Sequence, residues 1–119
     1  MQHAYAPYSD FRVGAALRAD DGSVIVGCNV ENSSFPAGSC AERGALAAAM
    51  VTGHRKFTHL AIVTDAAEPT SPCGMCRQAL MEFAPDLQVA SYTTSGAEAR
   101  WSLADLLPHP FTPQSLRHT

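Results

Sequence analysis

Cysteine and glutamate at the head of an alanine-rich segment point to metal-assisted chemistry. In SCAERGALAAAM, residues 39–50, Cys40 stands two positions before Glu42, where a run of good helix formers begins. Further along, SPCGMC places Cys73 and Cys76 three residues apart, so both thiols would face the same way on the first turn of a helix. Free N–H groups and the positive end of the dipole at a helix N-terminus favour thiolates over thiols.

These three cysteines predict a zinc site with one open position. A structural zinc site uses four protein ligands, but the sequence has neither a second C-x-x-C pair nor a suitable histidine pair. With Cys40 as the third ligand, the fourth position is left for water, as in catalytic sites. Glu42 is the candidate base for that water. Positions two apart on an ideal helix do not share a face, so we expect Cys40 at or before the first helical residue.

Arg43, next to Glu42, is predicted to donate hydrogen bonds to the thiolates. Three thiolates on zinc give the site a net negative charge, and hydrogen bonds from Arg43 would reduce the charge that the sulfurs donate to the metal.

Other interpretations exist for each of these residues taken alone. A lone C-x-x-C pair can be a redox pair or a structural clip, and a glutamate in the first turn of a helix is commonly a solvated residue. Cys28 has no partner at ligand spacing and fits a small buried apolar residue.

The composition is typical of one small globular domain. The chain has 119 residues, of which 46% are hydrophobic and 16% charged. A chain of this size builds one core but no cleft between two lobes, so a pocket for a small molecule is expected to need a neighbouring subunit. The net charge of -3 and the scattered arginines argue against a nucleic-acid partner. With no signal-peptide pattern and no long apolar run, we expect a cytoplasmic protein without membrane contact.

Strand and helix signals predict an α/β fold. Two apolar segments, 12–19 and 24–30, flank the turn signal Asp20-Asp21-Gly22 and predict a hairpin. A loop broken by Pro36 and Gly38 precedes a helix over about 40–51. A strand at 59–64 and a helix at 73–83, with Ser71 as its cap, follow. Strand 87–93, an edge segment at 95–102 and a short helix at 103–108 close a mixed-sheet sandwich.

The cysteine pattern also resembles a known signature. Cys40-Ala41-Glu42 followed by Pro72-Cys73-Gly74-Met75-Cys76 resembles that of the zinc deaminases, with cysteine as the first ligand. YAPYSDFRVGAAL, GCNVEN, CAER, SPCGMCRQ and LLPHPF are similar to the small homotetrameric cytidine deaminases, and the resemblance extends over residues 4–111. It implies a three-layer α/β/α sandwich around a mixed five-stranded sheet, as a single domain over 1–119.

The resemblance further implies an activity and a cofactor. One Zn²⁺ per subunit would be bound by the three cysteines, and Glu42 would be the catalytic proton shuttle. The reaction would be hydrolytic deamination of cytidine and deoxycytidine to uridine and deoxyuridine plus ammonia, in pyrimidine salvage. The partners would be a nucleoside substrate and three further copies of the chain, arranged as a homotetramer with shared active sites.

Substrate contacts are implied for six residues. Asn29 and Glu31 would bind the ribose hydroxyls, Phe11 the pyrimidine ring, and the backbone near Ala41 the carbonyl oxygen of the base. The set is Phe11, Asn29, Val30, Glu31, Ala41 and Phe111, the last reaching into a neighbouring subunit's site. Asn29 and Glu31 alternate along a strand and so face one way, and an amide with a carboxylate suits a sugar diol. Taken alone, these two fit strand-end polar residues, and the phenylalanines fit core residues.

The sequence departs from the family pattern in two places, and two alternative functions stay open. The family often has tyrosine where Phe35 stands, and it usually has a helix before AYAPYS, whereas only Met1-Gln2-His3 precede that motif here. We therefore expect the first family helix to be largely absent, and we expect the surface beneath it to be exposed or covered by a partner. One alternative is a deaminase for another aminopyrimidine nucleoside such as blasticidin S, against which the diol-binding NVEN motif argues. The other is a non-catalytic, zinc-stabilised binding module.

Overall fold

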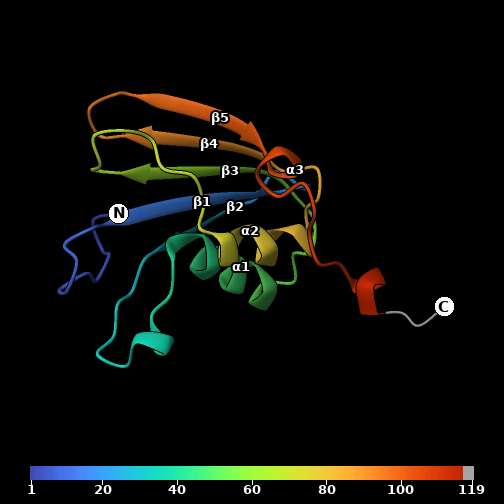
Figure 1. The fold of residues 1–119 in the computed structure, drawn as a ribbon, viewed down its shortest axis with the longest axis horizontal. Coiled ribbons are helices and arrows are strands. Elements are labelled where there is room, and N and C mark those ends of the chain that lie inside the picture. The colour runs from blue at the N-terminus through green and yellow to red at the C-terminus, as the bar shows by residue number, and fades with distance from the viewer. Residues whose placement is uncertain (117–119) are drawn as a thin grey trace.

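The computed structural model describes residues 1–116, and it has the expected order of elements (Figure 1). A hairpin comes first, and helices then alternate with strands. The strands are β1 (Val13–Ala19), β2 (Val24–Cys28), β3 (Phe57–Thr64), β4 (Gln88–Thr93) and β5 (Glu98–Ser102). The helices are α1 (Ala41–Val51), α2 (Gly74–Met81) and α3 (Leu103–Leu106), with the 3₁₀ helices η1 (Phe35–Ala37) and η2 (Pro113–Leu116).

The five strands form one mixed sheet in the order β2-β1-β3-β4-β5. Strand β1 pairs antiparallel with β2 and β3, and β5 pairs antiparallel with β4. The β3–β4 pair is parallel, so the chain must cross over between these two strands, and α2 makes that crossover. The predicted mixed five-stranded sheet is therefore confirmed.

Helices α1 and α2 pack on one face of the sheet, below the strands in Figure 1. The core between these layers takes every second residue of the central strands, including Leu17 of β1 and Leu60 and Ile62 of β3, all almost fully buried. Period-two alternation explains this selection, because successive strand side chains point to opposite faces. Leu103 of α3 joins the same core at the end of β5.

Helix α1 lies unusually close to β2. A Cβ atom on Gly27 would stand 2.5 Å from both the carbonyl oxygen of Ala41 and the backbone nitrogen of Ala45. Ala41, Ala45 and Ala49 are fully buried on the helix face that meets the sheet. Small residues on both elements allow this close approach, which fixes the start of α1 beside the end of β2.

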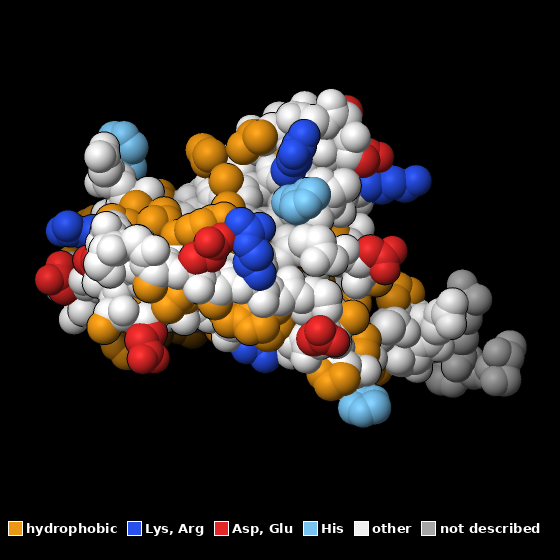
Figure 2. Space-filling model, turned by 90° about the horizontal axis from the view of Figure 1, so that it is seen from above, with side chains coloured by type: hydrophobic (Ala, Val, Ile, Leu, Met, Phe, Trp, Pro, Cys, Tyr) orange, Lys and Arg blue, Asp and Glu red, His pale blue; other side chains and the backbone are white. Residues whose placement is uncertain are grey.

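None of the helices within residues 1–116 covers the opposite face of the sheet. Val24 and Val26 of β2 are 62% and 71% exposed, and a hollow of about 330 Å³ over that face is lined by residues of β1, β2, β3, β4 and β5. Figure 2 shows exposed hydrophobic side chains in patches, with the basic side chains apart from one another. The described residues thus form one of the two helical layers expected for a three-layer sandwich. The strand residues that a second helical layer would cover are open to solvent. No described helix is long and apolar enough to cross a membrane.

Candidate metal centre and active site

The N-termini of α1 and α2 meet beneath the sheet, and a cysteine precedes each helix. Cys40 is the N-cap of α1, with φ −72° and ψ 154°, and Cys73 is the N-cap of α2, with φ −64° and ψ 165°. Both residues have extended backbone, outside the helices. The expectation that Cys40 stands at or before the first helical residue is confirmed. The prediction that Ser71 caps the second helix is wrong, because α2 begins only after Cys73 and the Ser71 hydroxyl accepts a hydrogen bond from Arg77 instead.

The three cysteine sulfurs form one cluster with the dimensions of a zinc site. The Sγ atoms of Cys40 and Cys73 are 3.7 Å apart, and all three Sγ atoms lie within 4.8 Å of one another. With Zn–S bonds of about 2.3 Å, a tetrahedral site separates its sulfurs by about 3.8 Å. Cys76, on the first turn of α2, is fully buried. The residues present fit zinc with three protein ligands.

The environment of the three thiols also favours a bound cation. Burial raises the pKa of Cys40 and, together with the nearby Glu42 carboxylate, that of Cys76. Burial opposes ionisation of Cys73 as well, but hydrogen bonds from the backbone and side chain of Cys76 outweigh it and lower the Cys73 pKa. A divalent cation would offset the charge of all three thiolates, and metal binding requires their deprotonation.

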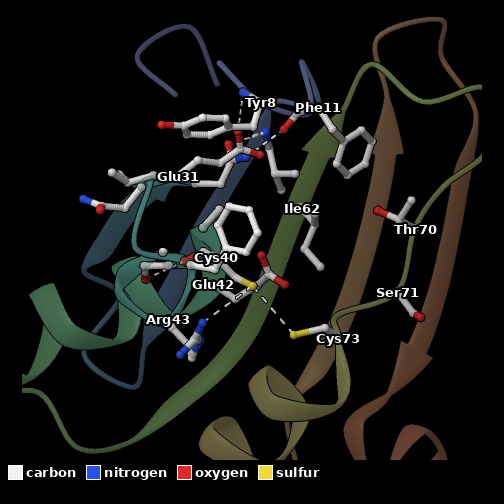
Figure 3. A pocket seen from close by; sticks show the side chains of 18 residues that line it. Tyr8, Phe11, Glu31, Cys40, Glu42, Arg43, Ile62, Thr70, Ser71 and Cys73 are labelled. Carbon is white, nitrogen blue, oxygen red and sulfur yellow. Dashed lines mark hydrogen bonds between the residues drawn. The ribbon is translucent and has the colours of Figure 1, made fainter. Parts of the chain in front are cut away.

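Arg43 reaches the sulfur cluster from α1. Its Nη2 donates to the Sγ of Cys40 at 3.9 Å (Figure 3). The hydrogen bond to this sulfur raises the pKa of Arg43. Its Nε is buried and has no hydrogen-bond partner among the described residues. The structure thus shows the donation from Arg43 to one cysteine sulfur, while its effect on the metal stays a prediction.

The Glu42 carboxyl group points into the pocket beside the sulfurs of Cys40 and Cys73 (Figure 3). A glutamate side chain in water is charged at neutral pH, yet Glu42 is only 5% exposed. Burial raises the pKa of Glu42, and hydrogen bonds with its own backbone and the Cys76 side chain, together with the charge of Arg43, only partly oppose this. A buried carboxyl group with a raised pKa can take up a proton and deliver it to a reacting atom, which is what general acid–base catalysis needs.

A pocket of about 430 Å³ opens above the sulfur cluster, a size typical of small-molecule sites. Five of the six residues predicted to contact substrate line it: Phe11, Asn29, Val30, Glu31 and Ala41. They come from the segment before β1, the segment after β2 and the start of α1, and Ile62 of β3 forms part of the wall. The structure thus brings together residues that are distant in the sequence.

Phe111 does not line this pocket. Its side chain is 58% exposed, and only its backbone is fixed: the Gln78 Oε1 accepts the Phe111 N–H at 3.2 Å, and the Gln78 Nε2 donates to the Phe111 carbonyl. The ring is therefore held on the outside of the subunit. Its predicted contact with a neighbouring site stays a prediction.

Several pocket residues are not found by the sequence argument. Tyr8 and Phe35 meet edge to face at the mouth, with ring centroids 6.4 Å apart, and Thr70 and Ser71 line the opposite side. Tyr8, Thr70 and Ser71 lie in loops and Phe35 begins the short 3₁₀ helix η1, and in such segments no periodic pattern marks the direction of a side chain. Cys28 lies over a separate hollow with Met1 and His3 and outside the sulfur cluster.

Arg77 fixes the loop that carries Cys73. Its guanidinium donates to the Pro72 carbonyl at 2.7 Å, to the Leu106 carbonyl at 2.9 Å and to the Ser71 hydroxyl at 2.7 Å. One side chain of α2 therefore joins the loop before the helix to the end of α3. This network holds the backbone on which the Cys73 ligand stands.

A comparison with known families agrees with this geometry. Residues 1–91 match the family described as the cytidine and deoxycytidylate deaminase zinc-binding region. The chain belongs to this family. The matched region includes the sulfur cluster and Glu42, and it leaves Phe111 outside.

Relatives and solved structures within this deaminase family cover most of the chain. The cytidine deaminase of Sporosarcina psychrophila is 43% identical over 118 residues, 98% of this chain and 87% of its own length. The crystal structure of cytidine deaminase from Burkholderia pseudomallei superposes with a TM-score of 0.88 at 46% identity, covering 92% of this chain and 89% of that one. The Mycobacterium tuberculosis enzyme gives a TM-score of 0.79 at 40% identity, covering 92% of this chain and 86% of that one.

Proposed function

We propose that the chain is a zinc-dependent cytidine deaminase. It converts cytidine and deoxycytidine to uridine and deoxyuridine, consuming water and releasing ammonia. The observation that carries this proposal is the buried Glu42 carboxyl group beside a three-cysteine cluster, at the base of a pocket of small-molecule size. The names of the similar proteins support the same reaction.

The proposed chemistry divides between the metal and Glu42. When bound by Cys40, Cys73 and Cys76, zinc supplies a Lewis acid that makes a water nucleophilic near neutral pH. Glu42 would accept a proton from the attacking water and donate it to the ring nitrogen N3, so that carbon C4 becomes electrophilic. Glu42 then passes the second proton of the water to the amino group, which leaves as ammonia. Its burial keeps competing water from the carboxyl group.

The pocket wall recognises the nucleoside in this proposal. Phe11 contacts the pyrimidine ring, and the backbone of Ala41, at the start of α1, donates to the carbonyl oxygen of the base, because a helix N-terminus offers free N–H groups. Asn29 and Glu31 bind the ribose hydroxyls, with Val30 between them. All five residues line the one pocket, which supports these assignments.

We also propose a homotetramer that acts in pyrimidine salvage in the cytoplasm. Phe111 of each subunit enters a neighbour's site. The exposed Phe111 ring on a backbone held by Gln78 supports this arrangement, as does the open mouth of the pocket, where the exposed Tyr8 and Phe35 side chains meet.

Substitution of Glu42 tests the function. Zinc-loaded wild-type protein is expected to release ammonia from cytidine and deoxycytidine. Glu42→Gln is expected to keep one zinc per subunit and to lower kcat by about 10²–10⁴-fold, the contribution of general acid–base catalysis. Glu82→Gln, an exposed glutamate at the end of α2, is the matched control and should behave like wild type. Turnover is followed by ammonia release and zinc by atomic absorption.

A substrate panel separates the alternatives. Cytosine nucleosides, nucleotides, free cytosine and blasticidin S are compared with the same zinc-loaded protein. Turnover of phosphorylated members alone would contradict the ribose role of Asn29 and Glu31, and turnover of blasticidin S alone would favour the other aminopyrimidine reaction. Zinc-loaded wild-type protein that turns over none of them would favour the non-catalytic binding module.

A further inference from the structure

The Glu31 carboxylate is already bound to the loop that faces it. Its Oε1 accepts the backbone N–H groups of Tyr8 at 2.9 Å and of Ser9 at 3.2 Å, and its Oε2 accepts the Ser9 hydroxyl proton. The hydrogen bonds from Ser9 and Tyr8 lower the pKa of Glu31, so the group is a carboxylate near neutral pH. Glu31 therefore organises residues 8–9 as well as facing the pocket.

The Ser9 hydroxyl continues this connection to the next pocket residue. While it donates to Glu31, its oxygen accepts the backbone N–H of Phe11 at 3.1 Å. Between Ser9 and Phe11, Asp10 has φ 56°, in the left-handed backbone region that residues other than glycine rarely adopt. Such a conformation persists where the surrounding contacts hold it, and the hydrogen bonds made by Ser9 are among those contacts.

Asn29 fixes the other side of Phe11. Its Nδ2 donates to the Phe11 carbonyl at 2.7 Å, and its Oδ1 accepts the Val13 N–H at 2.9 Å. The backbone of Phe11 is thus held at its N–H by Ser9 and at its carbonyl by Asn29. The orientation of the Phe11 ring in the pocket depends on both contacts.

We propose that Ser9 is a positioning residue of this site: its hydroxyl joins the carboxylate of Glu31 to the backbone of Phe11. One hydroxyl group thereby aligns the side chain facing the sugar with the ring facing the base. This inference rests on the proposed function for its effect on substrate, whereas the connection itself is visible in the free protein. Because Ser9 is exposed and lies outside the core, its substitution should leave the fold intact.

Kinetics of single and double variants test the proposal. Ser9→Ala is expected to raise KM for cytidine roughly tenfold to hundredfold, since hydrogen bonds to charged groups are the stronger ones, while kcat changes less. Ser9→Thr keeps the hydroxyl group and should restore KM. Ser34→Ala, which removes the hydroxyl group of an exposed serine before η1 that makes no capping hydrogen bond, is the control and should match wild type. In the Phe11→Ala background, Ser9→Ala should have a much smaller effect on KM, because there is no ring to align.

Amide hydrogen exchange by NMR tests the connection without activity. The Phe11 amide should exchange faster in Ser9→Ala than in wild type, Ser9→Thr or Ser34→Ala. Equal Phe11 exchange in wild type and Ser9→Ala, or a KM that does not change in an active Ser9→Ala enzyme, would overturn the proposal. Failure of wild-type protein to turn over cytidine would overturn the proposed function alone, because the exchange measurement would still decide the role of Ser9.

Discussion

Glu42 and Cys40 share one site because they do not share one helix. Cys40 has extended backbone, while Glu42 lies in the first turn of α1, so the two-residue spacing that would separate them on a helix brings them together here. The sequence predicted this arrangement, since only a cysteine before the first helical residue allows Glu42 to face the metal. The three cysteines that form the sulfur cluster were equally predictable, because both cysteine segments stand beside good helix formers.

The contacts of Glu31 with Ser9 could not be predicted from the sequence, because no sequence pattern marks a loop hydroxyl group that binds a distant carboxylate.

Arg43 offers the most direct test at the residue scale. Arg43→Ala removes the guanidinium that donates to Cys40 Sγ, and we expect zinc to be retained while kcat falls about 10- to 100-fold, as for other groups that hydrogen-bond metal ligands. The physical reason is that the thiolates then pass more negative charge to the metal, which makes its bound water less acidic. Zinc content and ammonia release are measured on the same preparation.

The control for this change is Arg100→Ala, which removes an arginine that is exposed on β5 and paired with Glu98. It should leave both zinc content and kcat unchanged. Full activity in Arg43→Ala would contradict an electrostatic role for Arg43. Loss of zinc in Arg43→Ala would show that the guanidinium supports metal binding itself.

At the scale of elements, the period-two and helix-start patterns located the five strands and the three α-helices of residues 1–116 to within a few residues, but they predicted neither of the 3₁₀ helices η1 and η2. Strand β3 begins at Phe57, two residues before the predicted start, and α2 ends at Met81, two residues before its predicted end. The cap of α2 was misassigned because serine is a common capping residue, whereas the extended N-cap residue of α2 is Cys73. How closely each helix lies on the sheet depends on packing, and for α1 the missing side chain of Gly27 leaves room for the backbone of Ala41 and Ala45.

Gly27→Ala tests how closely α1 must lie on β2. The added Cβ would stand 2.5 Å from two backbone atoms of α1, which cannot rotate away, so the helix must shift. We expect a loss of about 1–3 kcal/mol in the free energy of unfolding, the usual effect of overpacking, and weaker zinc binding because Cys40 moves with the helix. Chemical denaturation of the apo and zinc-loaded forms measures both effects.

Gly44→Ala is the matched control, since it adds the same methyl group to α1 itself. There the nearest heavy atom is the Cys28 carbonyl oxygen at 3.5 Å, an ordinary contact, and alanine is the better helix former by about 1 kcal/mol. Gly44→Ala should therefore leave stability unchanged or raise it. Equal destabilisation by both substitutions would show that the close approach at Gly27 is not what limits packing.

The whole molecule is where the sequence predicts least. Its composition predicts one small domain, but the residues that cover the second face of the sheet cannot be read from any local pattern. Within residues 1–116, that face exposes Val24 and Val26, and Phe111 is held outside the pocket of its own subunit. Both features concern surfaces that residues 1–116 leave open, and the proposed contacts between chains would account for them.

Mixing two defective variants tests whether the sites are shared. Phe111→Ala is expected to raise KM for cytidine roughly tenfold, as for loss of one aromatic contact to a base, and Glu42→Gln is expected to be almost inactive. In a mixed tetramer, a Phe111→Ala subunit keeps its own Glu42 and receives Phe111 from a Glu42→Gln neighbour. A population of sites with wild-type KM should then appear after the two variants are unfolded together and refolded with zinc.

Mixing without refolding is the control, because subunits that do not exchange should show only the Phe111→Ala kinetics. Light scattering after size exclusion should give four times the 12.6 kDa subunit mass for every sample. If Phe111 serves only its own subunit, the refolded mixture would keep the high KM of Phe111→Ala at every ratio of the two variants. Because Glu42 and Phe111 lie on opposite sides of the proposed subunit boundary, recovery of wild-type KM can arise only when one chain completes the site of another.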